Sequence, residues 1–342
     1  MLIASLIGLL VIVSGAIGIT LLAQKSNAML SASGQVTFFA NQNDPGGQTN
    51  SLHIDIQHLQ APPAGYDYEA WIINDQTEAV IGLGRLAGKN QTWSLTYSAT
   101  SGNLLEAGDK LEITQEQGVV NAPAGKVLLV GTFPVLAFRH IQHLLVGYPE
   151  TPGKIGLLIG VLQQTYLLDT QAAVLQSVST SRDTVAIECV TQSMLDIIDG
   201  IHGAHYQPLA ATCAQRNVTV IGDGFGLLGK GHFVDGAEKH ASLALSQKDA
   251  TGVMHRHAAL MDAALTNVTG WLTTVEQDVL HLQEHPSDLS SLQEITTLAD
   301  DAYHGVDVNG DGQIDPVIGE AGALTAYQQG QLMATLSLTS SV

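Results

Sequence analysis

The stretch Ser51-Leu-His-Ile-Asp-Ile-Gln57 alternates apolar and polar side chains, with Leu52, Ile54 and Ile56 on one face. Successive side chains of a strand point to opposite faces of its sheet, so the pattern predicts a strand with one buried face. The same period of two recurs at Val36 and Phe38, Tyr68 to Ile72, Trp93 to Tyr97, and Leu111 and Ile113, and an apolar run follows at Val127 to Val130. Turn signals such as Asp44-Pro45-Gly46 separate these runs. Residues 35–134 are therefore predicted to form an antiparallel β-sandwich domain.

Four segments of this domain resemble a known family. They are Tyr68-Glu-Ala-Trp71-Ile-Ile, Gly82-Leu-Gly84-Arg-Leu86, Leu111-Glu-Ile-Thr114 and Val127-Leu-Leu-Val-Gly131. Residues 35–134 thereby resemble the extracytoplasmic domain of the anti-sigma-K factor family. The resemblance implies a sandwich preceded by one transmembrane helix. In that family a cytoplasmic sigma-binding domain precedes the helix, whereas this sequence opens on its apolar segment, so we expect the fold to transfer without sigma binding.

The hydrophobic period changes after Pro134. Ile141, Leu144 and Leu145 follow the three- to four-residue spacing of an amphipathic helix, and similar spacing continues to the end of the sequence. The later helices are predicted at about 236–246, 252–285, 289–303 and 320–338. Residues 135–342 are therefore predicted to form a helical bundle domain.

The first 24 residues, Met1 to Gln24, contain no charged side chain. A run of this length is long enough to cross a bilayer as one helix, so residues 1–24 are predicted to be a transmembrane anchor and residues 25–34 a linker. Its small residues recur at helical spacing and would let another helix approach closely. This predicted packing face is Ala4, Gly8, Gly15 and Gly18. The predicted partners are the bilayer and other transmembrane helices or copies of the same chain, with the bulk of the chain extracytoplasmic. A cleaved signal peptide is the alternative for this segment.

Charge and cysteine content narrow the function further. The formal net charge is −19, with 13 Lys and Arg against 32 Asp and Glu, which excludes nucleic acid as a partner. Cys189 and Cys213 are the two cysteines and form one possible disulfide, with two buried thiols as the alternative. The sequence shows no catalytic constellation, so no catalytic residue is predicted, and a non-catalytic role is favoured. Gly222 to Gly229 is interpreted as a glycine-rich loop, because no βαβ unit surrounds it.

An acidic motif lies near the end of the sequence, at Asp307-Val-Asn-Gly-Asp-Gly-Gln-Ile-Asp315. Oxygen-bearing side chains stand at its first, third, fifth and ninth positions and glycine at its sixth, which is the pattern of an EF-hand loop. Residues 307–320 therefore resemble dockerin and EF-hand calcium loops. Ile318 occupies the twelfth position, where Glu is usual, and Glu320 is expected to supply that carboxylate. The predicted calcium ligands are Asp307, Asn309, Asp311, Gln313, Asp315 and Glu320.

Two histidine pairs have spacing that places both rings on one helix face. They are His140 with His143, and His281 with His285. Pairs of this kind hold transition metals in bundle interiors, and haem is a further possibility, whereas surface or hydrogen-bonded core histidines are the alternative. Of the two pairs, His140 and His143 are favoured because they open the bundle.

Three functions remain open from the sequence. The favoured prediction is a membrane-anchored, extracytoplasmic, non-catalytic subunit of a larger membrane or cell-surface assembly, with a calcium-stabilised helical domain. The first alternative is a metal-binding or redox protein that uses the histidines of the bundle. The second is a signalling ectodomain or a pilin-like filament subunit.

Overall fold

The computed structural model describes residues 31–41 and 47–341, which belong to one compact unit. The predicted anchor at 1–24, its face of Ala4, Gly8, Gly15 and Gly18, and most of the predicted linker at 25–34 lie outside the described residues. Within the described ranges, no helix combines the length and the apolar character that a membrane crossing requires. The predicted fold class therefore needs correction, because a transmembrane helix is not part of the described fold.

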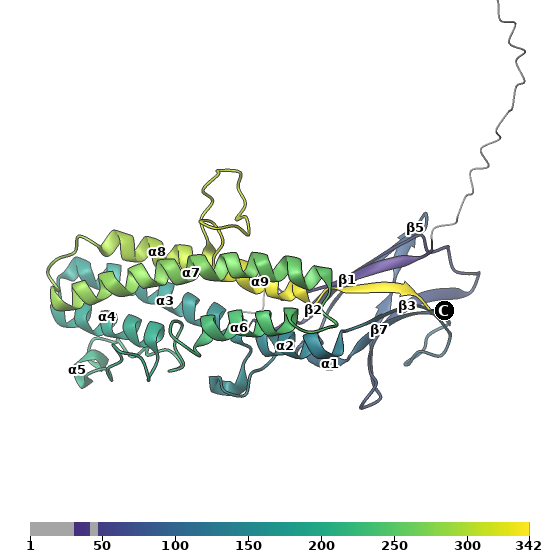
Figure 1. Ribbon diagram of the computed structural model, residues 1–342, viewed down its shortest axis with the longest axis horizontal. Coiled ribbons are helices and arrows are strands. Elements are labelled where there is room, and N and C mark those ends of the chain that lie inside the picture. Colours follow the sequence, from purple (N-terminus) through teal and green to yellow (C-terminus); the bar gives the residue numbers. More distant parts are fainter. Residues whose placement is uncertain (1–30, 42–46, 342) are drawn as a thin grey trace, which may run out of the picture. The chain divides into compact units, whose positions relative to one another are not determined.

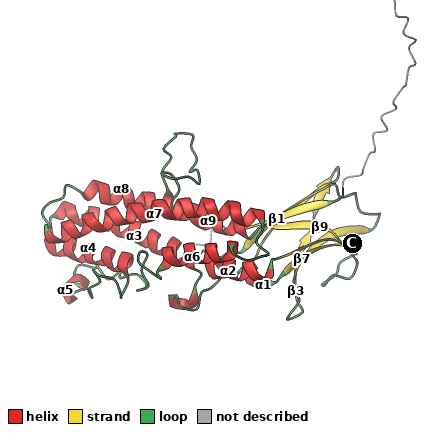
Figure 2. Cartoon of the chain, in the orientation of Figure 1, coloured by secondary structure: helices red, strands yellow, loops and turns green. Residues whose placement is uncertain are grey.

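The strands form one sheet rather than the two layers of the predicted sandwich. They are β1 (Ser33–Phe39), β2 (Ser51–Gln57), β3 (Tyr66–Asn74), β4 (Ala79–Arg85), β5 (Ala87–Lys89), β6 (Thr92–Ser98), β7 (Lys110–Gln117), β8 (Lys126–Thr132) and β9 (Leu336–Ser340). Their order is β4-β3-β7-β8-β9-β1-β2-β6-β5, with every neighbouring pair antiparallel. The sheet, yellow in Figure 2, is nearly closed, because β4 at one end of the strand order contacts β6 near the other end. A single sheet therefore encloses the apolar faces that two layers were expected to bury.

The ninth strand corrects a second expectation. The helix predicted over 320–338 ends early, because α9 covers Ala323–Met333 and the chain then extends as β9. In β9 Leu336 and Leu338 are buried while Ser337 is exposed, which is the alternation of a strand. The strand inserts between β8 and β1, where Leu336 pairs with Val36 and Thr339 pairs with Val130.

The helices form a bundle beside the sheet (Figure 1). They are α1 (Leu104–Ala107), α2 (Val135–Leu145), a 3-10 turn (Pro152–Lys154), α3 (Leu157–Ser181), α4 (Thr184–Asp199), α5 (Ala211–Ala214), α6 (Phe233–Leu245), α7 (Gly252–Glu284), α8 (Leu292–His304) and α9. Helix α3 packs on α4, α6, α8 and α9, and α7 packs on α4, α6, α8 and α9. Gly160 in α3 has no side chain because the ring of Phe233 fills that space, and a Cβ atom there would lie 1.9 Å from the ring.

Polar contacts join the sheet to the helices. The Tyr327 hydroxyl on α9 donates to the carbonyl of Gly47, and Gln331 Nε2 donates to Thr49 Oγ1 at 3.1 Å. Directly before α1, Asn103 Nδ2 donates to the carbonyl of Leu145 at the end of α2, at 2.8 Å. These groups are buried, so their pairing fixes the seam between sheet and bundle.

Candidate metal centre

Three imidazole rings converge where α2 packs against α6. His140 and His143 lie one turn apart on α2, and His240 lies on α6. His240 Nδ1 is 3.3 Å from His140 Nδ1 and 3.1 Å from His143 Nδ1. One ligand nitrogen from each ring lies within 4.8 Å of the other two. The sequence predicted the first two residues of this cluster and missed the third.

The two helices are held in register by groups outside the cluster. The Asp249 carboxylate, in the loop after α6, accepts hydrogen bonds from the backbone N–H groups of Leu136 and Ala137 at 2.8 and 3.1 Å. These amides belong to the first turn of α2 and have no partner within the helix, so the carboxylate satisfies them and complements the helix dipole. The start of α2 is thereby fixed to the end of α6, and both histidine-bearing faces meet.

Hydrogen bonds between the rings do not by themselves explain why three imidazoles lie so close together. A ring nitrogen carries either one hydrogen or one lone pair, so His240 Nδ1 makes one good N–H···N bond and not two. A metal ion between the rings would accept all three lone pairs together. Tetrahedral zinc has Zn–N bonds of about 2.0–2.1 Å, which places its ligand nitrogens about 3.3 Å apart. The observed separations from His240, 3.3 and 3.1 Å, fit that geometry.

The surroundings keep the rings neutral. His240 is 6% exposed, and its burial, with the neighbouring rings of His143 and His140, lowers its pKa from 6.5 to about 4. Burial also lowers the pKa of His143 and of His140, helped by the Arg139 charge. A neutral imidazole is the form that binds a metal, so the ligands are ready at neutral pH.

One side of the cluster is aromatic, and two of its three rings are partly exposed. The ring of Tyr148 packs against His143 and His240, with centroids 5.3 and 4.9 Å apart. His140 and His143 remain half-buried. Across residues 31–41 and 47–341, no fourth His, Cys, Asp or Glu joins the group. Three protein ligands with an accessible fourth position are the arrangement found in catalytic rather than structural zinc sites.

The second predicted histidine pair lacks this convergence. The rings of His281 and His285 have centroids 5.0 Å apart, and His281 Nε2 pairs with Asp288 Oδ2 at 3.3 Å. Both partners of that ion pair are about half exposed. In the described part of the chain these residues do not form a cluster of three ligand atoms.

The predicted calcium loop connects α8 to α9 and projects from the helices (Figure 1). The Asp307 carboxylate accepts hydrogen bonds from the N–H groups of Gly310, Asp311 and Gly312 at 2.7 to 3.2 Å. Among the described residues, the loop carboxylates are not gathered into a three-ligand cluster within 4.8 Å. The first carboxylate therefore organises the loop backbone.

Glu320 lies against this loop. It is 6% exposed, and its Oε2 accepts a hydrogen bond from the N–H of Asp315 at 3.1 Å. Asn309 Nδ2 also donates to Asp315 Oδ2 at 3.1 Å. Ile318 at the twelfth position is instead 64% exposed. Glu320 thus contacts the backbone of the loop, and its role as a calcium ligand stays a prediction.

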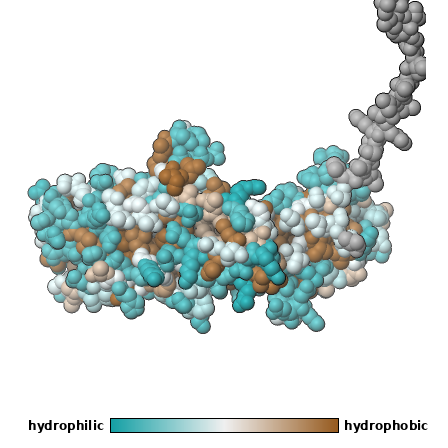
Figure 3. Space-filling model, in the orientation of Figure 1, coloured by the Kyte–Doolittle hydropathy of each residue, from teal (hydrophilic) through white to brown (hydrophobic). Residues whose placement is uncertain are grey.

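The loop also carries apolar side chains on its outer surface. Val308, Val317 and Ile318 are 68%, 45% and 64% exposed. They account for an apolar area on the projecting loop, beside hydrophilic side chains (Figure 3).

Two further clusters were not predicted. Asp199, His205 and Glu276 bring ligand atoms within 4.8 Å of one another, as do Asp169, Asp300 and His304. The second of these is mostly exposed, and His304 already pairs with Asp300 at 2.7 Å on the same face of α8. The first joins α4, the following loop and α7, so no local spacing in the sequence could reveal it.

The two cysteines form a disulfide. Cys189 on α4 bonds to Cys213 on α5, 24 residues later. It ties the segment after α4 back to the bundle, and it agrees with the first of the two alternatives that the sequence left open.

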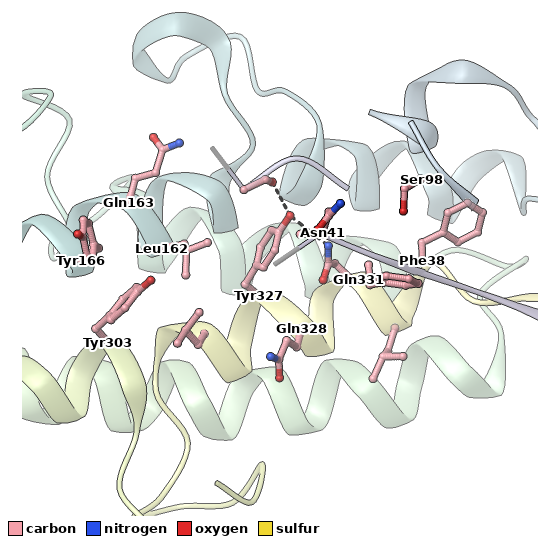
Figure 4. A pocket seen from close by; sticks show the side chains of 15 residues that line it. Phe38, Asn41, Ser98, Leu162, Gln163, Tyr166, Tyr303, Tyr327, Gln328 and Gln331 are labelled. Atoms are coloured by element: carbon pink, nitrogen blue, oxygen red, sulfur yellow. Dashed lines mark hydrogen bonds between the residues drawn. The ribbon is translucent and has the colours of Figure 1, made fainter. Parts of the chain in front are cut away.

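A pocket of about 1020 Å³ lies at the seam between sheet and bundle (Figure 4). Tyr166, Tyr303 and Tyr327 line it together with side-chain amides and leucines, and none of the described lining residues is charged. The Tyr327 hydroxyl and the Gln331 amide are already hydrogen-bonded to the segment before β2. These two polar groups therefore serve the seam rather than a ligand.

Comparison with family models, with curated proteins and with solved structures finds no match to this chain. The resemblances to anti-sigma-K ectodomains and to dockerin loops stay predictions.

Proposed function

We propose that this protein binds one divalent transition-metal ion through His140, His143 and His240. The observation that carries the proposal is that His240 Nδ1 lies 3.3 and 3.1 Å from the Nδ1 atoms of His140 and His143, with one ligand atom of each ring within 4.8 Å of the others. The histidine alternative among the sequence-based hypotheses is thus the one that the geometry favours. The predicted subunit, signalling and filament roles stay predictions.

The donor set favours an ion over haem. Imidazole nitrogen suits zinc, copper, nickel and iron, and the separations of about 3.3 Å expected for tetrahedral zinc agree with the cluster. Axial haem ligands approach iron from opposite faces of the porphyrin, whereas His240 Nδ1 lies only 3.3 and 3.1 Å from the other two nitrogens, which leaves no room for a porphyrin between them. Zinc is therefore the ion that we expect, with a water molecule at the open fourth position.

Metal titration of the full chain tests this proposal. After treatment with a chelator, the protein is titrated with Co²⁺, whose visible spectrum distinguishes tetrahedral from octahedral coordination, and then with Zn²⁺ in competition. We expect one tetrahedral Co²⁺ that Zn²⁺ displaces, and its loss in His240→Ala. His255→Ala is the matched control, because His255 is an exposed histidine on α7. Equal Co²⁺ spectra from the wild type and His240→Ala would overturn the assignment.

A calcium ion in the loop at 307–320 is a second and separate proposal. It is supported by the buried carboxylate of Glu320 on the loop and by the acidic pattern from Asp307 to Asp315. A single loop at the surface would brace the connection between α8 and α9.

A further inference from the structure

The cluster of Asp199, His205 and Glu276 has a chemistry different from that of the three histidines. Asp199 ends α4, His205 lies in the following loop, and Glu276 lies on α7. Asp199 Oδ2 accepts a hydrogen bond from the backbone N–H of His205 at 2.7 Å, and the ring atom His205 Nε2 lies 3.8 Å from Glu276 Oε1. One ligand atom from each residue lies within 4.8 Å of the others.

The local backbone is shaped to bring these groups together. Gly203 stands directly over Asp199, and a Cβ atom on it would lie 2.3 Å from the Asp199 Cβ. The turn after α4 can therefore fold back tightly onto the aspartate and present His205 to α7. Gln192 Nε2 donates to the carbonyl of His205 at 3.0 Å, which holds the loop from the other side.

Among the described residues, no lysine or arginine pairs with the carboxylates of Asp196, Asp199 or Glu276. Asp199 is 8% exposed, and Asp196, one turn earlier on the same helix, is 1% exposed. Asp196 Oδ2 has no hydrogen-bond partner among the described residues. The ion pair with His205 is the only one that the described residues make with Asp196, Asp199 or Glu276. Buried carboxylates without a cation are costly, and a positive ion would remove the cost.

We propose that Asp199, His205 and Glu276 bind a second divalent cation of the Mn²⁺ class. Two carboxylates and one imidazole form a harder ligand set than three imidazoles, and carboxylate ligands suit manganese. Asp196 lies one turn before Asp199 on α4 and is not one of the three ligands. The site is independent of the proposed zinc site, since it shares no residue with that site.

Electron paramagnetic resonance measures Mn²⁺ binding directly, because the signal of the free hydrated ion falls when the ion binds. The full chain is titrated with Mn²⁺ alongside Asp199→Asn and Glu276→Gln, each of which removes one ligand charge with little change in shape. Glu188→Gln is the matched control, because Glu188 is an exposed carboxylate on α4. We expect both ligand variants to bind Mn²⁺ at this site at least about tenfold more weakly than the wild type. The control should bind Mn²⁺ with the same affinity as the wild type. An ion bound at the loop 307–320 would persist in all of them.

The outcomes separate this site from the proposed function. His240→Ala should keep Mn²⁺ binding while losing Co²⁺, and Glu276→Gln should do the reverse. Thermal unfolding without metal checks that the variants are folded, and removing a like charge should not lower their melting temperature. Equal Mn²⁺ binding by the wild type and by both folded ligand variants would overturn the inference, as would no Mn²⁺ binding by the wild type.

Discussion

Acidification should destabilise the metal-free protein through His240. The ring is 6% exposed, and its pKa is lowered from 6.5 to about 4 by burial and by two neighbouring imidazoles. Between these values the unfolded chain binds a proton that the folded protein does not, so the free energy of unfolding falls as the pH falls from 6.5 to 4. One pKa unit corresponds to about 1.4 kcal/mol, so this histidine accounts for about 3 kcal/mol.

The substitution His240→Gln isolates this contribution, because glutamine is polar, similar in length and does not titrate. Urea unfolding is measured for the wild type and the variant at pH 7, 5.5 and 4, with a chelator present. Other titrating groups affect both proteins, so they largely cancel in the difference between the two. We expect the wild type to lose about 3 kcal/mol relative to the variant between pH 7 and pH 4.

If the difference in free energy of unfolding between wild type and variant changed with pH by no more than about 0.5 kcal/mol, the usual error of additivity, that result would refute this reasoning. It would mean that the His240 ring is protonated in the folded protein or that the cluster opens to solvent. Zinc gives an independent check at pH 7. At a concentration 100 times its dissociation constant, it should stabilise the wild type by about 2.7 kcal/mol and leave the variant unchanged.

Three further outcomes are expected. Gly160→Ala should lower the free energy of unfolding by about 1–3 kcal/mol, because its methyl group would overlap the buried ring of Phe233. Gly270→Ala has open space at the Cβ position and should raise the free energy of unfolding by about 0.5–1 kcal/mol. Urea unfolding of the two variants compares them. Replacing Cys189 and Cys213 by serine should cost about 3 kcal/mol by the loop-entropy account, measured by the same method, and no change would mean that the linked segment is ordered without the bond. Calcium should raise the melting temperature of the wild type and not of Glu320→Gln in differential scanning calorimetry, and equal shifts would remove Glu320 from the ligand set.

Much of the strand pattern was accessible from the sequence, because strands with one buried face alternate in the predicted way. Val36 and Phe38 in β1 and Leu52, Ile54 and Ile56 in β2 are buried as expected. Strand β4 is absent from the predicted strands, since Gly82 and Gly84 interrupt its alternation. Gly82 in fact makes room for the Trp71 ring on the neighbouring strand, and a Cβ atom there would lie 3.1 Å from it.

The sequence of β9 alternates as a strand does, but the helical pattern of α9 directly before it led to the prediction of a longer helix. Leu336 and Leu338 alternate with polar residues, but they directly follow the helical period of α9 and extend it by spacing. This segment forms a strand because β1 and β8 each have an edge that β9 pairs with, and the sequence does not show that these two edges lie side by side. The single curved sheet follows from the same long-range pairing.

The histidine cluster was likewise predictable from the sequence only in part. Spacing on one helix identified His140 and His143, whereas His240 is 100 residues from His140 along the chain. Its signal was its place among Ala237, Ala241 and Ala244, the buried stripe of α6, where a polar ring is unexpected. A titratable residue within an apolar helix face is therefore informative even when it has no partner nearby in sequence.

The position of β9 has a consequence for synthesis on the ribosome. Strands β1 to β8 emerge first, then about two hundred residues of helix and loop, and β9 follows last. Until Ser340 has left the exit tunnel, the edges of β1 and β8 that β9 later covers carry unpaired backbone groups able to pair with another chain. The nascent protein therefore passes through a long interval in which its sheet is open, and chaperone binding at these edges would protect it during translation.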